Sequence, residues 1–244
     1  MAMNKKTMKI EPNPKNTRQG QGKNTKYAAT SRNRAKKAYR GQGRWMYCLE
    51  GNDEWTQLDP QDIWVYNKLQ LSALLGYQCG PVGTSVPSSG LYIVRPVMNF
   101  LGMGRNSRIE YLKSSTDHLH PGEFWCEVFK GEHLSVDFYK KECVLVVKGH
   151  KNHKNPLYKW SCWSKINKII GFPPILSSLI GNYEWINCEF IGNKLIEVQL
   201  RRNPDFRYEN TIAIPVWKGE KVKNMKNYRF ISDPDYQREG FYVK

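Results

Sequence analysis

The stretch LYIVRPVMNFLGMGR, residues 91–105, is the part of the sequence from which the fold is interpreted. Its β-branched and apolar start predicts a short strand that ends in a cation, Arg95, before a proline. Gly102-Met103-Gly104 then predicts a loop. Upstream, Lys68 lies on an apolar helical pattern, and downstream a second strand leads to Glu132. Two cations, a glycine loop and carboxylates in this order predict a nucleotide pocket.

Positive charge is concentrated at the N-terminus. The 244 residues carry a formal net charge of +16. Residues 1–44 hold 13 Lys or Arg and one acid, Glu11, whereas the remainder holds 25 bases and 21 acids. Because residues 1–44 have almost no large aliphatic side chains, we expect a disordered basic arm. Such an arm suits nucleic acid or another polyanion, RNA and DNA alike; the alternative is a solvated tail that aids solubility or docks to a protein.

The composition also argues against several protein classes. No run of about 18 apolar residues is present, so no membrane span is expected. No apolar segment follows the N-terminal lysines, so the N-terminus is not a secretory signal. The cysteines form no Cys-x-x-Cys pair, and we expect reduced thiols in a cytoplasmic protein rather than a zinc ribbon. They are Cys48, Cys79, Cys126, Cys143, Cys162 and Cys188.

Hydrophobic periodicity predicts a mixture of helices and strands. Asp59 and Pro60 resemble a helix start, and the apolar face continues to about Leu75. A second helix is expected over 161–170, and a surface-wrapping segment over 218–244. Strands are expected over 91–95, 108–112, 124–130, 133–139, 143–148, 185–190, 194–200 and 212–217. The sequence therefore predicts an α+β fold.

The order of these elements resembles the ATP-grasp family of carboxylate–amine ligases. A lysine on a helix, Val86-Pro87 before a strand, the cation-Pro strand end, the glycine loop and a hairpin ending in Glu197-x-Gln199 follow the family pattern. The resemblance extends from about Asp62 to Asp205. It implies two αβ subdomains with antiparallel sheets, at 62–128 and 129–231, with the nucleotide between them. The implied flanking parts are the arm at 1–44, a connector at 45–61 and a C-terminal tail at 232–244.

The resemblance also implies roles for individual residues. The ATP phosphates would contact Lys68, Arg95 (where the family usually has lysine) and the loop residues Gly102, Met103 and Gly104. Glu127 would meet the adenine, and Glu132 the ribose. Magnesium would be held from two adjacent strands by Asn187 or Glu189 with Glu197 and Gln199. Arg201 and Arg202 would hold an acyl-phosphate intermediate.

Physical chemistry agrees with this metal site. Magnesium prefers hard oxygen ligands and accepts one or two carboxylates together with phosphate oxygens. Glu197 and Gln199 are two residues apart on a strand, so their side chains face the same way. Asn187 and Glu189 do the same across the hairpin.

Two functions follow from the sequence. The first is an ATP- and Mg²⁺-dependent ligase that activates a small-molecule or peptide carboxylate as an acyl phosphate for attack by an amine. The alternative is a non-catalytic nucleic-acid-binding or assembly protein that uses the basic arm; this would suit a viral or phage protein in the host cytoplasm.

Plainer interpretations stand beside these roles. Lys68 would be a solvated lysine on a helix, and Arg95-Pro96 an ordinary strand end. Glu197 would pair with Lys194 or Arg201 at the surface. His118 and His120 could face together as metal ligands, although no third ligand is evident. Trp160, Trp163 and Trp185 would belong to the core rather than to a stacking platform.

Overall fold

The computed structural model describes residues 39–41, 44–46, 58–98, 104, 106–152, 154–206, 209–234 and 238–244. Residues 35–244 form one compact unit. Most of the basic arm, and the loop residues Gly102 and Met103, lie outside the described residues. At the end of the arm, strand β1 (Tyr39–Gly41) pairs with β2 (Arg44–Met46), and disorder in the rest of the arm stays a prediction.

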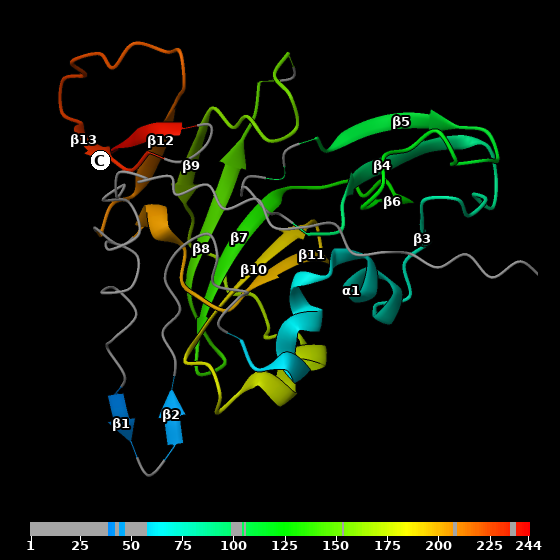
Figure 1. Cartoon of the computed structure of the whole chain (residues 1–244). Coiled ribbons are helices and arrows are strands. Elements are labelled where there is room, and N and C mark those ends of the chain that lie inside the picture. The colour runs from blue at the N-terminus through cyan, green and yellow to red at the C-terminus, as the bar shows by residue number, and fades with distance from the viewer. Residues whose placement is uncertain are drawn as a thin grey trace, which may run out of the picture. The chain divides into compact units, whose positions relative to one another are not determined.

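A four-stranded antiparallel sheet holds residues 91–96, the predicted strand that ends in Arg95 and a proline (Figure 1). Its strand order is β3-β6-β4-β5. The strands are β3 (Cys79–Pro81), β4 (Gly90–Pro96), β5 (Arg108–Leu112) and β6 (Glu123–Glu127). One face carries a small core that includes Tyr92, Val94, Leu112 and Trp125. Arg95, next to Val94, therefore faces the other side.

The second sheet has eight antiparallel strands in the order β11-β10-β7-β8-β9-β12-β14-β13. Figure 1 shows β7, β8, β10 and β11 side by side. The strands are β7 (His133–Tyr139), β8 (Glu142–His150), β9 (Cys162–Lys165), β10 (Trp185–Ile191), β11 (Lys194–Gln199), β12 (Ile212–Trp217), β13 (Arg229–Ser232) and β14 (Arg238–Val243). Strand β11 is an edge strand, with β10 as its neighbour.

Among the described residues helices are few and short, so this part of the fold is mostly β, with less helix than the predicted α+β class implies. They are η2 (Pro60–Tyr66), α1 (Lys68–Leu74), η3 (Pro174–Leu179) and η4 (Pro204–Phe206). The single helix predicted from Asp59 to Leu75 is interrupted at Asn67, which is extended and whose side chain caps α1 by accepting from the Gln70 amide. None of the helices in the described parts has the length and apolar character needed to cross a bilayer.

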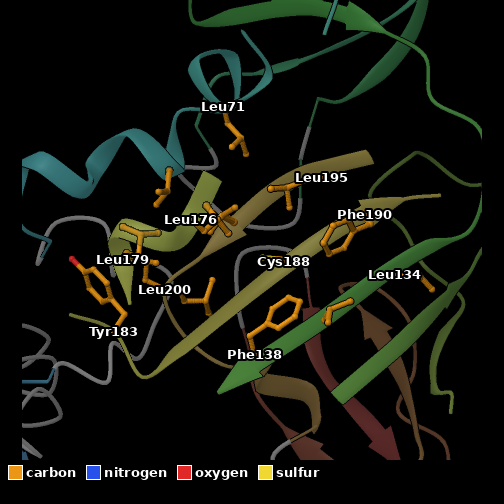
Figure 2. Close-up of a cluster of buried hydrophobic side chains, with 14 of the residues drawn as sticks. Leu71, Leu134, Phe138, Leu176, Leu179, Tyr183, Cys188, Phe190, Leu195 and Leu200 are labelled. Carbon is orange, nitrogen blue, oxygen red and sulfur yellow. The ribbon is translucent and has the colours of Figure 1, made fainter. Parts of the chain in front are cut away.

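The main core lies on one face of the eight-stranded sheet (Figure 2). Leu134, Val136 and Phe138 of β7 alternate into it, together with Leu71 of α1 and Leu176 of η3. All five side chains are almost completely buried. The short helices thus occupy one face of β7, β10 and β11, and the alternate residues of these strands face the opposite side.

Two further elements differ from the sequence prediction. The helix expected over 161–170 is absent: Cys162–Lys165 is strand β9, which pairs with β8 and β12. The expected surface-wrapping segment contains strands β13 and β14 instead. Phe241 and Val243 of β14 are buried in a small core with Ala213, which explains why this segment joins the sheet.

Candidate functional site

A cavity of about 800 Å³ is lined by residues from both sheets and from α1. This volume is in the range of small-molecule and cofactor sites. The four-stranded sheet contributes Ile93 and Arg95, α1 contributes Lys68, and the eight-stranded sheet supplies most of the remaining lining. The site is therefore formed where Ile93 and Arg95 of β4 meet the polar face of the larger sheet.

Strands β7, β10 and β11 place six polar side chains in two rows, which we call the polar lattice. One row pairs Asp137 with Asn187 and Asn187 with Gln199. The other row pairs Ser135 with Glu189 and Glu189 with Glu197. These residues share a face because each strand alternates its side chains, and the registers bring them level. The four residues predicted to hold a metal thus lie together.

Lys68, the first residue of α1, reaches this lattice at its edge. Its Nζ lies 3.2 Å from Glu197 Oε2, and Gln199 donates to Glu197 Oε1 at 3.1 Å. Burial lowers the pKa of Lys68, although the Glu197 carboxylate acts against this. Burial raises the pKa of Glu197, but the Lys68 ammonium, the hydrogen bond from Gln199 and the Arg95 cation together outweigh it and lower this pKa. Lys68 is therefore not a solvated lysine, because it is buried and forms an ion pair with Glu197. For the same reason, Glu197 is not simply a surface partner of Lys194 or Arg201.

Arg95 provides a second buried cation. Only 7% of its surface is exposed, and its guanidinium lies 5.1 Å from the centre of the Phe124 ring. Its Nε has no hydrogen-bond partner among the described residues. Burial lowers the pKa of Arg95, whereas the nearby Glu197 and Glu189 carboxylates raise it. A buried donor without a partner is costly, so this side of the cavity favours a ligand rich in acceptors.

Asp137 holds the segment after β11 against the lattice. The Asn203 backbone N–H donates to both of its oxygens, at 2.9 and 3.0 Å, and the Asn187 amide donates at 2.7 Å. Burial raises the pKa of Asp137 to about 6, against these hydrogen bonds. Of the two arginines predicted to hold an intermediate, Arg201 lines the cavity. Arg202 does not belong to the described lining and lies 6.0 Å from the Trp185 ring.

The remaining predicted nucleotide-binding residues lie in different places. Glu132 lines the cavity and pairs with Lys148 at 2.6 Å and Lys168 at 3.6 Å. Gly104 also lines it, with a φ of 59° that favours glycine. Glu127 is missing from the described lining, and its carboxylate accepts the Gln78 backbone N–H at 3.0 Å.

The lattice fits magnesium as a partial site. Across the described residues, no three His, Cys, Asp or Glu side chains come together as a metal site. Glu189 and Glu197 nevertheless stand directly opposite each other, next to the amides of Asn187 and Gln199. Two carboxylates are enough for Mg²⁺ when phosphate oxygens and water complete its coordination. His118 instead contacts Glu110 at 2.7 Å, and no metal site forms around it in the described residues.

Comparison with known proteins gives only distant matches. No protein-family model and no curated protein matches the sequence. An ATP-grasp superfamily protein from Archaeoglobus fulgidus aligns at 13% identity and a TM-score of 0.43, over 74% of this chain and 64% of the other. The L-amino acid ligase from Bacillus licheniformis aligns at 13% identity and 0.38, over 57% and 41%. The ligase PsnB, solved with minimal precursor, Mg and ADP, aligns at 13% identity and 0.37, over 64% and 58%.

In structure, this chain resembles ATP-grasp proteins. The alignments span less than two thirds of the length of each of these proteins.

Several cavity residues were missed from the sequence. His133, Ser135 and Asp137 alternate with the apolar residues of β7. This alternation is a signal in the sequence from which they could have been placed on the polar face. Trp160 and Trp163 were assigned to the core, yet both are half-buried and line the cavity. No such pattern marks Asn203, whose position depends on the fold of the segment after β11.

Proposed function

We propose that the protein is an ATP- and Mg²⁺-dependent ligase that activates a carboxylate as an acyl phosphate for attack by an amine. The observation that carries this proposal is the meeting of two buried cations, Lys68 and Arg95, with the opposed carboxylates Glu189 and Glu197 in one cavity. A small-molecule or peptide carboxylate would be the acceptor. The resemblance of the sequence pattern to ATP-grasp enzymes supports the same reaction.

The cations favour a polyphosphate ligand. Burying a charge costs several kcal/mol even in real, relaxed protein sites. Lys68 has a carboxylate partner, whereas Arg95 keeps a buried N–H without one in the described residues. A triphosphate supplies several acceptor oxygens and negative charge, so both cations would gain partners when it binds. Gly104 in the adjoining loop would allow close approach of the backbone.

The carboxylates would hold magnesium. Glu189 and Glu197 would each offer oxygens, with Gln199 and Asn187 beside them, and the ion would neutralise phosphate charge. Glu197 would then turn part of its interaction from Lys68 to the metal. Lys68 would in turn be released to contact phosphate oxygens.

The reaction balances without a redox step. A carboxylate oxygen of the acceptor attacks the terminal phosphorus, and ADP leaves. The amine nitrogen then attacks the acyl carbon, inorganic phosphate leaves, and the nitrogen loses a proton. Arg201, which lines the cavity, would stabilise the charged acyl phosphate. Asp137 would position this arginine through its hydrogen bonds to Asn203.

A thermal-shift titration with MgATP tests the binding step. A ligand at 100 times its Kd stabilises a protein by about 2.7 kcal/mol, which corresponds to roughly 5–10 °C for a chain of this size. We expect this shift for the wild type and for Lys113→Met, an exposed lysine outside the described cavity lining. Lys68→Met and Arg95→Met should show little or no shift relative to their own ligand-free proteins. Equal shifts in all four proteins would contradict the proposal.

Turnover is tested by ADP release with mixtures of carboxylates and amines. Glu197→Gln should abolish release that the wild type supports, while Glu142→Gln should retain it, because Glu142 is exposed and outside the described cavity lining. If Glu197→Gln releases ADP as fast as the wild type does, the chemistry belongs to another site.

A second candidate function is supported by the charge of the N-terminal arm. Residues 1–44 carry a net charge of +12, and we infer that they bind nucleic acid or another polyanion. Replacing lysines of this arm should weaken salt-dependent RNA and DNA binding and leave the MgATP shift unchanged. Lys68→Met should remove the MgATP shift and leave RNA and DNA binding unchanged.

A further inference from the structure

One wall of the cavity is aromatic. Trp160 and Trp163 lie with ring centroids 4.8 Å apart, and the His133 ring stands edge-on to them at 4.6 and 5.5 Å. All three rings line the cavity and are only partly buried. We call these residues the aromatic wall. Partly exposed rings facing a cavity leave apolar surface that an aromatic ligand would cover.

Gly149 sets the position of the aromatic wall. A Cβ at this residue would lie 2.7 Å from the Trp160 ring and 3.0 Å from the Trp163 ring. Both rings therefore rest on a position that only glycine leaves open. The Trp217 indole also donates to the Trp160 carbonyl at 3.2 Å. The wall is preorganised, so a ligand would pay little entropy to order it.

A cation lies above the wall. The Lys151 ammonium is 5.8 Å from the centre of the Trp160 ring. Three other cations of the cavity, Lys68, Lys148 and Arg238, each pair with a carboxylate. In the part of the chain that the structure describes, Lys151 has no such partner, and burial lowers its pKa. This end of the cavity therefore combines apolar ring surface with a positive charge that no acid neutralises.

The aromatic wall adjoins the polar lattice. His133 packs on both indoles, and its Nε2 lies 2.9 Å from Glu189 Oε2. A ligand with its ring on the wall would therefore extend toward the carboxylates where phosphoryl transfer is proposed.

We propose that the aromatic wall and Lys151 form a subsite for an aromatic carboxylic acid, with the ring against Trp160 and Trp163 and the negative charge attracted by Lys151. This acid is the acceptor that the ligase activates. The assignment of the acid as acceptor rests on the proposed function, whereas its binding does not. An acid without a ring would lack the apolar contacts, and a neutral aromatic compound would lack the interaction with Lys151.

Ligand-observed NMR titrations of the full chain test the binding, with 3-phenylpropionate, propionate and 3-phenyl-1-propanol as probes in the millimolar range. We expect 3-phenylpropionate to bind most tightly. Trp163→Leu and Gly149→Val should weaken it about three- to tenfold, the value of a ring contact. Lys151→Gln should reduce its affinity to that of the alcohol. Trp185→Leu serves as the control, because Trp185 is not part of the described lining and should leave binding unchanged.

The outcomes separate this inference from the proposed function. If 3-phenylpropionate binds no more tightly than propionate, or if Trp163→Leu and Trp185→Leu act alike, the aromatic subsite is refuted. An unchanged affinity of Lys151→Gln for 3-phenylpropionate also refutes the aromatic subsite. The Lys151 side chain is only partly buried, so this substitution should not disturb folding. If aromatic binding behaves as expected but MgATP gives no thermal shift, the ligase proposal fails and the subsite stands. If MgATP gives a thermal shift but the aromatic acid is not preferred, the subsite fails and the ligase proposal stands.

Discussion

Removing the ammonium of Lys68 provides a quantitative test of the site. Lys68→Met keeps most of the apolar stem but leaves Glu197, whose side chain is 14% exposed, without this cation. Removing one partner of a buried ion pair costs about 3–5 kcal/mol, because the remaining charge stays buried. Gln199 still donates to Glu197, and Arg95 still attracts it. We therefore expect the lower end of the range, about 3 kcal/mol.

The double variant decides whether this cost comes from the uncompensated charge. Lys68→Met with Glu197→Gln removes both charges, and replacing a buried pair by neutral residues is often neutral. We expect its free energy of unfolding to lie within about 1 kcal/mol of the wild type, well below the sum of the costs of the two single substitutions. Lys113→Met, at an exposed position, should change stability by less than about 0.5 kcal/mol.

Urea unfolding followed by circular dichroism measures these differences, at neutral and at acidic pH. In Lys68→Met, burial without the ammonium would raise the folded-state pKa of Glu197 above its unfolded value. The variant should therefore regain stability as the pH falls through that pKa, because the buried charge is neutralised. The reasoning is refuted if the effects of the two single substitutions simply add, or if Lys68→Met is as stable as the wild type.

Three further predictions concern the surroundings of the site. Burial raises the pKa of Asp137 from 3.8 to about 6, so the folded protein binds more protons than the unfolded chain between these values; its stability should fall by up to about 3 kcal/mol from about pH 4 to about pH 7. Asp137→Asn should lack this dependence in urea unfolding, and an unchanged pH profile would contradict it. Arg238→Ala leaves Asp205, which it contacts at 2.7 Å, without this cation and should cost about 3 kcal/mol by the same assay, more than an exposed arginine would. Phe138→Ala opens the main core and should lower stability by about 3–5 kcal/mol while the urea midpoint falls; a loss under 1 kcal/mol would show that the core collapses around it.

The lattice was accessible from the sequence where a local rule was enough. Glu197 and Gln199 share a face because strand side chains alternate, and the hairpin through 191–193 places Glu189 opposite Glu197. The pairing of β7 with β10 joins residues about 50 positions apart, and no local pattern announces that register. For this reason Asp137 entered the site only with the structure.

Tertiary contacts overrode local preference at other elements. The segment 161–170 was predicted as a helix, but Cys162–Lys165 pairs with strands on both sides, and such pairing decides conformation more than propensity does. Arg201 and Arg202 were assigned together, yet only Arg201 belongs to the described cavity lining, and Arg202 lies 6.0 Å from the Trp185 ring.

The order of strands in the larger sheet has a consequence for how the site forms in time. Strands β7, β8 and β9 are neighbours in the chain and in the sheet, and so are β10 and β11. Each group can close with short loops, whereas the contact between β7 and β10 must close a much longer one, at a greater entropic cost. The polar lattice spans the contact between β7 and β10. Refolding should therefore restore backbone signals of the hairpins before it restores ligand binding.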